Sequence, residues 1–323
     1  MFTDLSELAA RVPRPDDDAR AAARARLGEL APAGAYGRLG ELAEWIAGIQ
    51  GQCPTRPLEQ VRFVAVATSV PSATPDISTG PRLSAILPFS SATPHLVERF
   101  LRFEAGDDVN NHPQDTEGEP RESPGAVEQA FEDGLTLADE QVETGADLLV
   151  LADVAGGGSA IAAATVVAVL TGTDVASTVG SIGIDDREWM RRCAAVRDTA
   201  RIARRALADG ADIFGLLSTV GSTELAICTG VLTQAAIRRT PVVLDGLGTA
   251  AAALVAHRLS PRTARWLLAG HVSTDPGHAA ALAKLRLRPL IDYAIDVDDG
   301  TGALLAVTHV QAAARLLTPE ERA

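Results

Sequence analysis

The sequence predicts an α/β fold in which a parallel sheet is covered by helices on both faces. Short apolar segments alternate with longer helical segments from about residue 124 onward. Strands that are buried on both faces read as continuous apolar runs, and their alternation with helices is typical of parallel sheets. Apolar residues make up 46% of the 323 residues and aromatic residues only 4%, so we expect a core of Ala, Val, Leu and Ile.

The first third of the chain predicts helices and one strand. Residues 1–35 are rich in Ala, Arg and Asp and predict one or two short helices. Residues 39–49 place their apolar side chains on one helical face, which must pack against another surface. Residues 61–67 predict the first strand. Residues 104–123 are acidic and poor in apolar residues, which indicates a surface loop.

After residue 124 the pattern becomes regular. The predicted helices cover residues 125–143, 160–170, 185–208, 223–238, 250–259 and 279–287. The predicted strands cover residues 148–154, 213–217, 241–244 and 266–269, followed by an extended segment at 290–295. Gly145-Ala146-Asp147 resembles Gly210-Ala211-Asp212, and we expect each triplet to end a helix and lead into a strand.

Charge and composition exclude several classes of partner. A formal net charge of −13 disfavours nucleic acid and anionic membranes. The apolar run at 160–170 is too short to span a bilayer, and the polar N-terminus does not resemble a signal peptide. Cys53, Cys193 and Cys228 are widely separated, so neither a disulfide framework nor a zinc site is predicted. We expect a cytoplasmic protein.

Glycine, hydroxyl and carboxylate residues follow each predicted strand. Ligands of open α/β sheets bind beyond the carboxyl ends of the strands, and glycine allows backbone N–H groups to approach an anion. One such loop is compatible with an ordinary cap or turn, whereas five in succession favour a composite ligand site. The candidate binding residues in these loops are Asp153, Gly156, Gly157, Gly158, Ser159, Gly221, Ser222, Glu224, Asp245, His271, Gly300 and Gly302.

Alternatives remain for individual residues in these loops. Asp153 and Glu224 are as compatible with an interaction at a helix end as with ligand binding. For His271, a structural role is favoured over a catalytic one. Gly156-Gly157-Gly158 does not complete the G-x-G-x-x-G pattern of dinucleotide-binding proteins, and the sequence contains no P-loop. These absences argue against an ordinary nucleoside-triphosphate or NAD enzyme.

The same loops resemble those of the nicotinate-nucleotide:dimethylbenzimidazole phosphoribosyltransferase family. The resemblance extends over about residues 124–315, and residues 37–50 resemble the family's N-terminal helix. It implies a Rossmann-like α/β domain at residues 56–302, a small helical domain formed by residues 1–55 with 303–323, no cofactor or metal, and a homodimer. The stretches that carry it are residues 221–226, 241–253 (PVVLDGLGTAAAA), 271–278 (HVSTDPGH) and 298–306 (DDGTGALLA).

The resemblance also implies roles for particular residues. Asp299 aligns with the family's general-base glutamate in E-G-T-G, and Asp153 aligns with the glutamate of its G-E-M-G-I-G-N-T-T loop. The phosphate-binding loop V-G-R-G-T-G aligns with residues 179–183, which assigns Gly180, Ser181 and Gly183 to substrate binding. The lysine of the following helix aligns with Arg192.

Other positions depart from the family pattern. Residues 65–70 read AVATSV where the family has A-G-D-H-G-V, and the loop at 179–183 is one residue short and has no arginine. Both glutamates that align with Asp153 and Asp299 are replaced by the shorter aspartate. A carboxylate retracted by about 1 Å is a poorer proton acceptor unless the backbone follows.

The implied reaction transfers a phosphoribosyl group from nicotinate mononucleotide to an aromatic base, 5,6-dimethylbenzimidazole or a related N-heteroaromatic. The product is an α-ribazole-phosphate-type nucleotide of cobamide biosynthesis, and Asp299 would accept the proton that the base loses. The altered residues favour a second hypothesis, a catalytically weak or inactive relative that binds a nucleotide or assists an enzyme. An unrelated Rossmann-type enzyme is disfavoured by the missing fingerprint.

Overall fold

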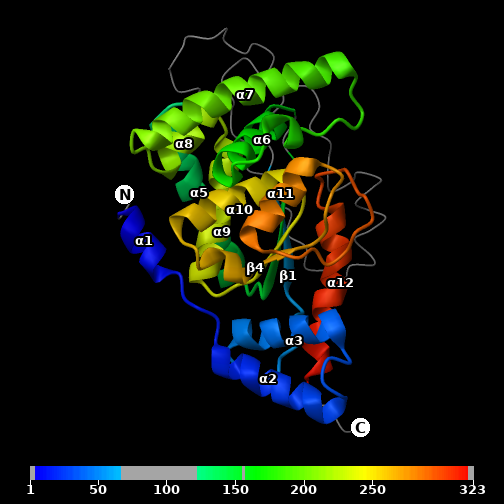
Figure 1. The fold of residues 1–323 in the computed structure, drawn as a ribbon. Helices are drawn as coiled ribbons and strands as arrows, with labels where there is room; N and C mark the ends of the chain where they lie inside the picture. Colours follow the sequence, from blue (N-terminus) through cyan, green and yellow to red (C-terminus); the bar gives the residue numbers. More distant parts are fainter. Residues whose placement is uncertain (1–3, 67–121, 155–156, 319–323) are drawn as a thin grey trace.

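The computed structural model describes residues 4–66, 122–154 and 157–318 (Figure 1). Its parallel sheet has the order β1-β2-β3-β4, which confirms the predicted α/β class. Leu149 of β2 pairs with Val242 of β3, and Val242 pairs with Leu267 of β4. The strands are β1 (Val61–Val66), β2 (Leu148–Asp153), β3 (Val242–Leu244) and β4 (Leu267–Ala269).

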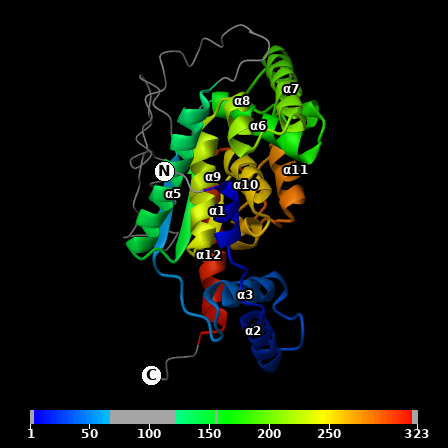
Figure 2. The same cartoon turned by 90° about the vertical axis from the view of Figure 1, so that its left-hand side faces the viewer.

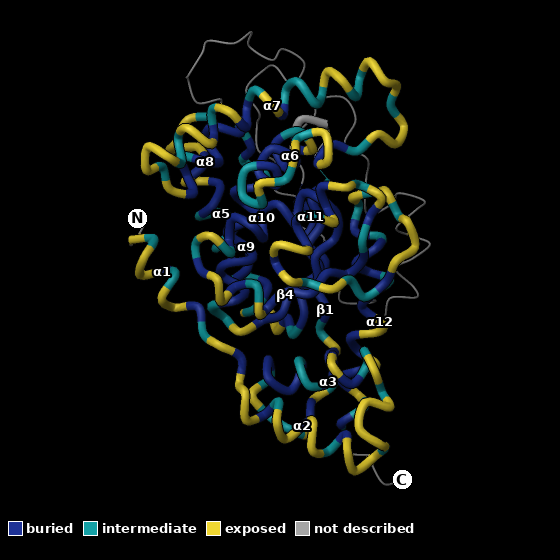
Figure 3. The backbone as a smooth tube through the Cα atoms, viewed as in Figure 1, coloured by how far each residue is buried: buried dark blue, intermediate teal, exposed yellow. Residues whose placement is uncertain are grey.

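Alternate side chains of the strands enter two different layers of the core. Val64, Leu149 and Leu151 pack on one face of the sheet, and Phe63 and Val150 pack on the other. Figure 3 shows this central region as buried backbone enclosed by more exposed helices. The first face is covered by α5 (Pro124–Glu143), α6 (Gly157–Thr171), α9 (Thr223–Ile237), α10 (Leu247–Leu259) and α11 (Pro276–Leu285). The second is covered by α3 (Gly37–Gln50) and α12 (Thr301–Leu316).

The remaining helices lie at the two poles of the molecule. At one pole α2 (Asp17–Leu30) packs on α3 beside the end of α12, as Figures 1 and 2 show. At the other pole α7 (Asp186–Ala208) follows the short helix η1 (Val175–Ser177) and packs on α6 and α8 (Ile213–Val220). Outside these groups, α1 (Leu5–Arg11) contacts α10, and η2 (Thr263–Trp266) leads directly into β4. Across the described ranges, no helix combines the length and apolarity that a membrane span requires.

The predicted strand at 213–217 is wrong, because these residues belong to helix α8 (Ile213–Val220). The carboxylate of Asp212 accepts a hydrogen bond from the N–H of Gly215 at 2.9 Å and so caps the helix. Asp147, at the corresponding place of the similar triplet, instead accepts the N–H groups of Glu59 and Gln60 ahead of β1. The Gly-Ala-Asp triplet alone therefore does not show whether a helix or a strand follows. The hydrogen-bond donor that its aspartate accepts from does show this.

The extended segment predicted at 290–295 forms no regular strand. It contributes one parallel bridge, between Ile291 and His271, and Tyr293 beyond it is 66% exposed. The predicted loop at 104–123 lies outside the described residues except for its last two positions.

The apolar face of α3 is covered within the chain. Its Leu42, Ala43 and Ile46 pack in one cluster with Val307 and Val310 of α12. The expectation that this face needs a partner surface is therefore met without a second chain.

We expect Asp212→Ala to destabilise the protein by about 1 kcal/mol, because α8 loses its N-terminal cap. The free energy of unfolding in urea measures this cost. Asp209→Ala is the matched control, because its carboxylate is exposed and lies 3.8 Å from Arg205. Equal stabilities of the two variants would contradict the capping role.

Candidate active site

Asp245 organises the carboxyl edge of the sheet. It directly follows β3 and its side chain is completely buried. Its two carboxylate oxygens accept hydrogen bonds from the backbone N–H groups of Gly300 and Ala303, each at 2.9 Å. Gly300 has no side chain with which to cap α12, so a carboxylate from the sheet caps that helix instead. This bond fixes the loop at 298–300 above the ends of the strands.

The glycines of the 300–302 motif are required by close packing. Gly300 has a φ of 93°, and a Cβ atom there would overlap the ring of Phe63 in β1. A Cβ atom at Gly302 would overlap the imidazole ring of His271. Both glycines therefore seat α12 against the sheet, and direct contact of either with a substrate stays a prediction.

Asp153 and Ser159 converge on the same edge from β2 and α6. Asp153 is 5% exposed and accepts a hydrogen bond from the hydroxyl of Ser159 at 2.8 Å. Its carboxyl group packs so closely on Gly248 of α10 that a Cβ atom at this glycine would not fit. Gly157 and Gly158 begin α6, whereas Gly156 lies outside the described residues.

The pKa values of His271 and His278 shift in opposite directions. The Nε2 atom of His271 lies 3.3 Å from Asp245, an ion-pair distance without the alignment of a hydrogen bond. Burial lowers the pKa of His271, but the nearby carboxylate of Asp245 outweighs this effect and raises the pKa overall. Burial and the neighbouring His271 lower the pKa of His278 to about 4, and its Nδ1 accepts the N–H of Ser273 at 3.1 Å. His278 is thus a neutral, structural histidine.

Asp298 is the acidic residue at this edge that sequence reasoning did not select. Its carboxyl group packs on Gly246 at the start of α10, so that a Cβ atom there would overlap it. The residue as a whole reaches solvent, but its carboxyl group lies in this crowded corner. Loss of hydration, together with the charges of Asp245, Asp153 and Asp275, raises the pKa of Asp298 to about 7 against the opposing effect of His271.

Asp299 is bonded to its own loop. Its carboxylate accepts a hydrogen bond from the N–H of Thr301 at 3.0 Å, a local turn interaction. The adjacent pair Asp298-Asp299 was visible in the sequence, but alignment with the family motif pointed to the second member. Only the backbone path through the loop reveals that the first member faces the ends of β2 and β3.

A second part of the site lies beside this corner. Gly180 and Arg192 line a cavity of about 110 Å³, and Gly180 and Ser181 line an adjoining one of about 230 Å³. Asp275 and Asp296 contribute to both. The Nε atom of Arg192 donates a hydrogen bond to Glu188 at 2.8 Å. Burial raises the pKa of Asp275, and the charge of Asp296 adds to this effect, while the N–H of Gly277 opposes it.

The structure gives the other predicted residues more local positions. Gly183 has a φ of 74° in the loop that continues from Gly180. Gly221 ends α8 with a φ of 72°, and Ser222 caps α9 by accepting the N–H of Leu225 at 3.2 Å. Ser222 also donates a hydrogen bond to Glu224 at 2.9 Å. This turn joins α8 to α9, whereas the sequence had indicated that it follows a strand.

Buried carboxylates, close-packed glycines and cavities at the carboxyl edge of a parallel sheet are typical of α/β enzymes, whose ligands usually bind at this edge. A phosphoribosyltransferase family model matches residues 12–83 and 97–321. A nicotinate-nucleotide–dimethylbenzimidazole phosphoribosyltransferase of Mycobacterium avium (strain 104) is 39% identical over 96% of this chain and 94% of its own length. The chain belongs to the nicotinate-nucleotide–dimethylbenzimidazole phosphoribosyltransferase family, which confirms the resemblance and the prediction of a pentosyl-transferring enzyme.

Other relatives agree with this assignment. An enzyme of the same name from Streptomyces coelicolor (strain ATCC BAA-471 / A3(2) / M145) is 39% identical over 98% of this chain and 93% of its own length. The crystal structure of CobT from Thermus thermophilus superposes with a TM-score of 0.75 at 28% identity, covering 93% of this chain and 96% of that one.

We expect Asp298→Asn to stabilise the protein relative to the native chain at pH 8 but not at pH 4. The pKa of Asp298 is about 7 in the folded state against 3.8 normally, so the unfolded chain loses this proton first as pH rises. The native protein therefore loses stability between about pH 4 and pH 7, and the asparagine variant does not. Urea unfolding at both pH values measures the difference. If the native chain and Asp298→Asn differ in stability by the same amount at pH 4 and at pH 8, the carboxyl group of Asp298 is normally solvated.

Proposed function

We propose that this chain transfers the phosphoribosyl group of nicotinate mononucleotide to an N-heteroaromatic base such as 5,6-dimethylbenzimidazole. The product is an α-ribazole-phosphate-type nucleotide for cobamide biosynthesis. The relatives that carry this name support the choice of substrates. The observation that carries the chemistry is the Asp298 carboxyl, which has a near-neutral pKa and lies where the loops after β2 and β3 meet α12.

The reaction needs one proton acceptor at neutral pH. A ring nitrogen of the base attacks the anomeric carbon of the ribose, and the bond from that carbon to the nicotinate nitrogen breaks. The other ring nitrogen of the base then releases its proton. A carboxylate whose pKa lies near the working pH accepts such a proton efficiently.

Asp298 is available for this role because the neighbouring carboxylates already have protein partners. Asp245 accepts two backbone N–H groups, Asp153 accepts the hydroxyl of Ser159, and Asp275 accepts the N–H of Gly277. Asp299 is held by Thr301. In the described part of the chain, Asp298 is the carboxyl of this group for which the structure records no hydrogen-bond donor.

The cavities beside this corner suit the phosphate end of the nucleotide. Gly180, Ser181 and Gly183 supply a loop with exposed backbone, and Arg192 supplies a guanidinium group at its edge. Guanidinium groups bind phosphate through paired hydrogen bonds. We assign this loop and Arg192 to binding the 5′-phosphate. Asp153 lies at the same carboxyl edge as Asp245, and we assign it to binding the ribose hydroxyls.

We expect the purified protein to release nicotinate from nicotinate mononucleotide only when an acceptor base is present. Asp298→Asn should lower the rate by about 10²-fold to 10⁴-fold, which is the usual contribution of a positioned base. Asp299→Asn is the matched neighbour and tests the role that the family alignment gives it. Nucleotide binding without nicotinate release, for every benzimidazole and purine offered, would establish the accessory-protein alternative instead.

The pH profile distinguishes a proton acceptor from a merely structural aspartate. We expect kcat/KM to rise with pH and to level off above about pH 7, because only the ionised form of Asp298 accepts a proton. This rise should disappear in Asp298→Asn, whatever activity remains. A variant that keeps the native profile would assign the titrating group to another residue.

We also propose a cytoplasmic homodimer in which residues 1–55 and 303–323 form a small domain. The resemblance to the family supports the dimer, whereas the packing of α3 within one chain does not require it. Sedimentation at micromolar concentration tests the assembly. Twice the mass of 33.6 kDa is expected, and a single-chain mass would contradict the proposal.

A further inference from the structure

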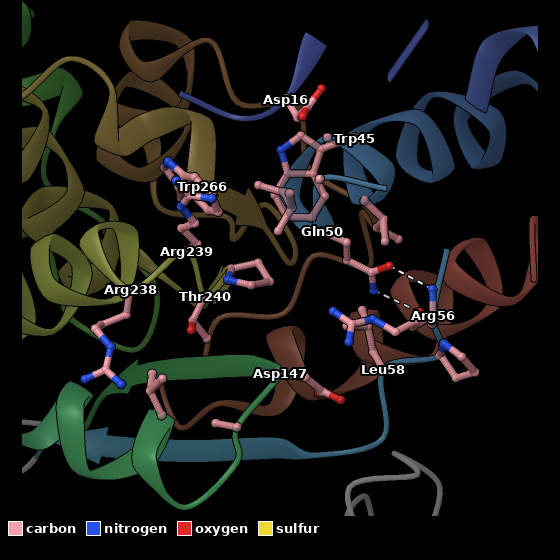
Figure 4. Close-up of a pocket in the computed structure, with 18 of the residues that line it drawn as sticks. Asp16, Trp45, Gln50, Arg56, Leu58, Asp147, Arg238, Arg239, Thr240 and Trp266 are labelled. Atoms are coloured by element: carbon pink, nitrogen blue, oxygen red, sulfur yellow. Dashed lines mark hydrogen bonds between the residues drawn. The ribbon is translucent and has the colours of Figure 1, made fainter. Parts of the chain in front are cut away.

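A cavity of about 720 Å³ lies at the amino ends of the strands, away from the candidate active site (Figure 4). Its walls come from α3, from the segments that precede β1, β2 and β3, and from Trp266 ahead of β4. None of the residues assigned to phosphoribosyl transfer lines it. Its volume lies within the range of about 300–1,000 Å³ that is usual for small-molecule sites.

Hydrogen bonds fix the walls of this cavity. The indole N–H of Trp45 donates to the carbonyl of Arg265 at 2.9 Å, and that of Trp266 donates to the carbonyl of Pro13 at 3.0 Å. The side-chain amide of Gln50 bonds the backbone of Arg56 in both directions, at 2.8 Å and 2.7 Å. The cavity is therefore preformed, and its polar backbone groups are largely occupied.

The charge of the lining is opposite to that of the chain. Arginines outnumber aspartates around the cavity, although the whole chain carries a net charge of −13. Both aspartates are engaged, because Asp147 accepts backbone N–H groups ahead of β1 and Asp16 caps α2 through the N–H of Ala19. Arg238 pairs with Asp139 at 2.5 Å and is turned toward α5.

Arg14, Arg56 and Arg239 are the cations left open to the cavity. All three are exposed, and their side chains form no ion pair or hydrogen bond with any residue that the structure describes. Figure 4 shows Arg56 and Arg239 on different walls. A helix C-terminus attracts cations and accounts for Arg239 at the end of α9, but Arg14 and Arg56 precede α2 and β1 and need another explanation.

The backbone of Arg239 takes a left-handed conformation. Its φ is 60°, and the N–H of the following Thr240 donates to the carbonyl of Ala235 at 2.8 Å. Glycine is the residue favoured at this position after a helix, so a glycine would fit here without backbone strain. Arg286 at the end of α11 has the same conformation, so this backbone is not specific to the cavity.

We propose that this cavity binds a small polyanion of the pyrophosphate class through Arg14, Arg56 and Arg239. Unpaired guanidinium groups on separate walls match a ligand with more than one phosphate group, because each fork binds phosphate oxygens in pairs. The site lies at the opposite end of the strands from the nucleotide corner, so the two ligands do not compete for the same residues.

Tryptophan fluorescence reports on this cavity selectively. The chain has three tryptophans, of which Trp45 and Trp266 line the cavity and Trp189 lines the pocket next to Gly180. In a Trp189→Phe background, inorganic pyrophosphate should produce a saturable change in fluorescence at constant ionic strength. No saturable change would overturn the proposal.

Two arginine variants distinguish binding in this cavity from a general effect of losing one positive charge. Arg239→Gly removes one guanidinium and relieves the positive φ, so the fold is retained while pyrophosphate affinity falls roughly tenfold. Arg286→Gly is the matched control, because Arg286 is an exposed arginine with a φ of 57° at the end of α11, outside the cavity. We expect the control to bind like the parent. Equal loss of affinity in both variants would contradict a site at Arg239.

Discussion

The buried carboxylate of Asp245 is the interaction on which the active-site corner depends. It joins the end of β3 to the first turn of α12 through two backbone hydrogen bonds and places a negative charge 3.3 Å from His271. Two backbone donors and one histidine compensate this charge in a fully buried position, so the arrangement tolerates little change. The 298–300 loop, and with it Asp298, takes its position from this one side chain. Gly300 and Gly302 allow the helix to approach closely enough for the bonds to form.

Crowding of carboxyl groups then sets the chemistry of the corner. The carboxyl group of Asp245, which holds α12, raises the pKa of a second carboxyl group nearby. Asp298 is that second carboxyl, and its pKa of about 7 follows from loss of hydration around its carboxyl group and from the charges of Asp245, Asp153 and Asp275. A structural requirement of the fold thus produces a group that exchanges protons near neutral pH.

The two ends of the strands differ in character. The carboxyl edge brings together buried carboxylates, glycines and the cavities beside Gly180, whereas the amino end has a larger cavity with unpaired arginines. Helix N-termini point toward the first edge and helix C-termini toward the second, so the backbone alone favours anions only at the first. The positive charge that would hold an anion at the second edge must therefore come from side chains, such as those of Arg14 and Arg56.

Apolar runs at β1, β2, β3 and β4 were predictable because strands buried on both faces leave a continuous signal in the sequence. Helix α8 was mistaken for a strand because a short apolar run fits either state, and the deciding contact of Asp212 is a matter of local geometry. Motif alignment located the 298–302 loop and pointed to Asp299, which stays a prediction, whereas the packing of Asp298 on Gly246 has no periodic signature in the sequence. The amino-end cavity was not predictable, because Arg14, Arg56 and Arg239 are distant in sequence and come to line one cavity only through packing.

A crystal structure of the protein soaked with nicotinate mononucleotide tests the central claim most directly. The account predicts the ribose beside Asp298 and Asp153, with the phosphate against the backbone of residues 180–183. A nucleotide bound elsewhere, with the corner around Asp245 left unoccupied, would contradict it.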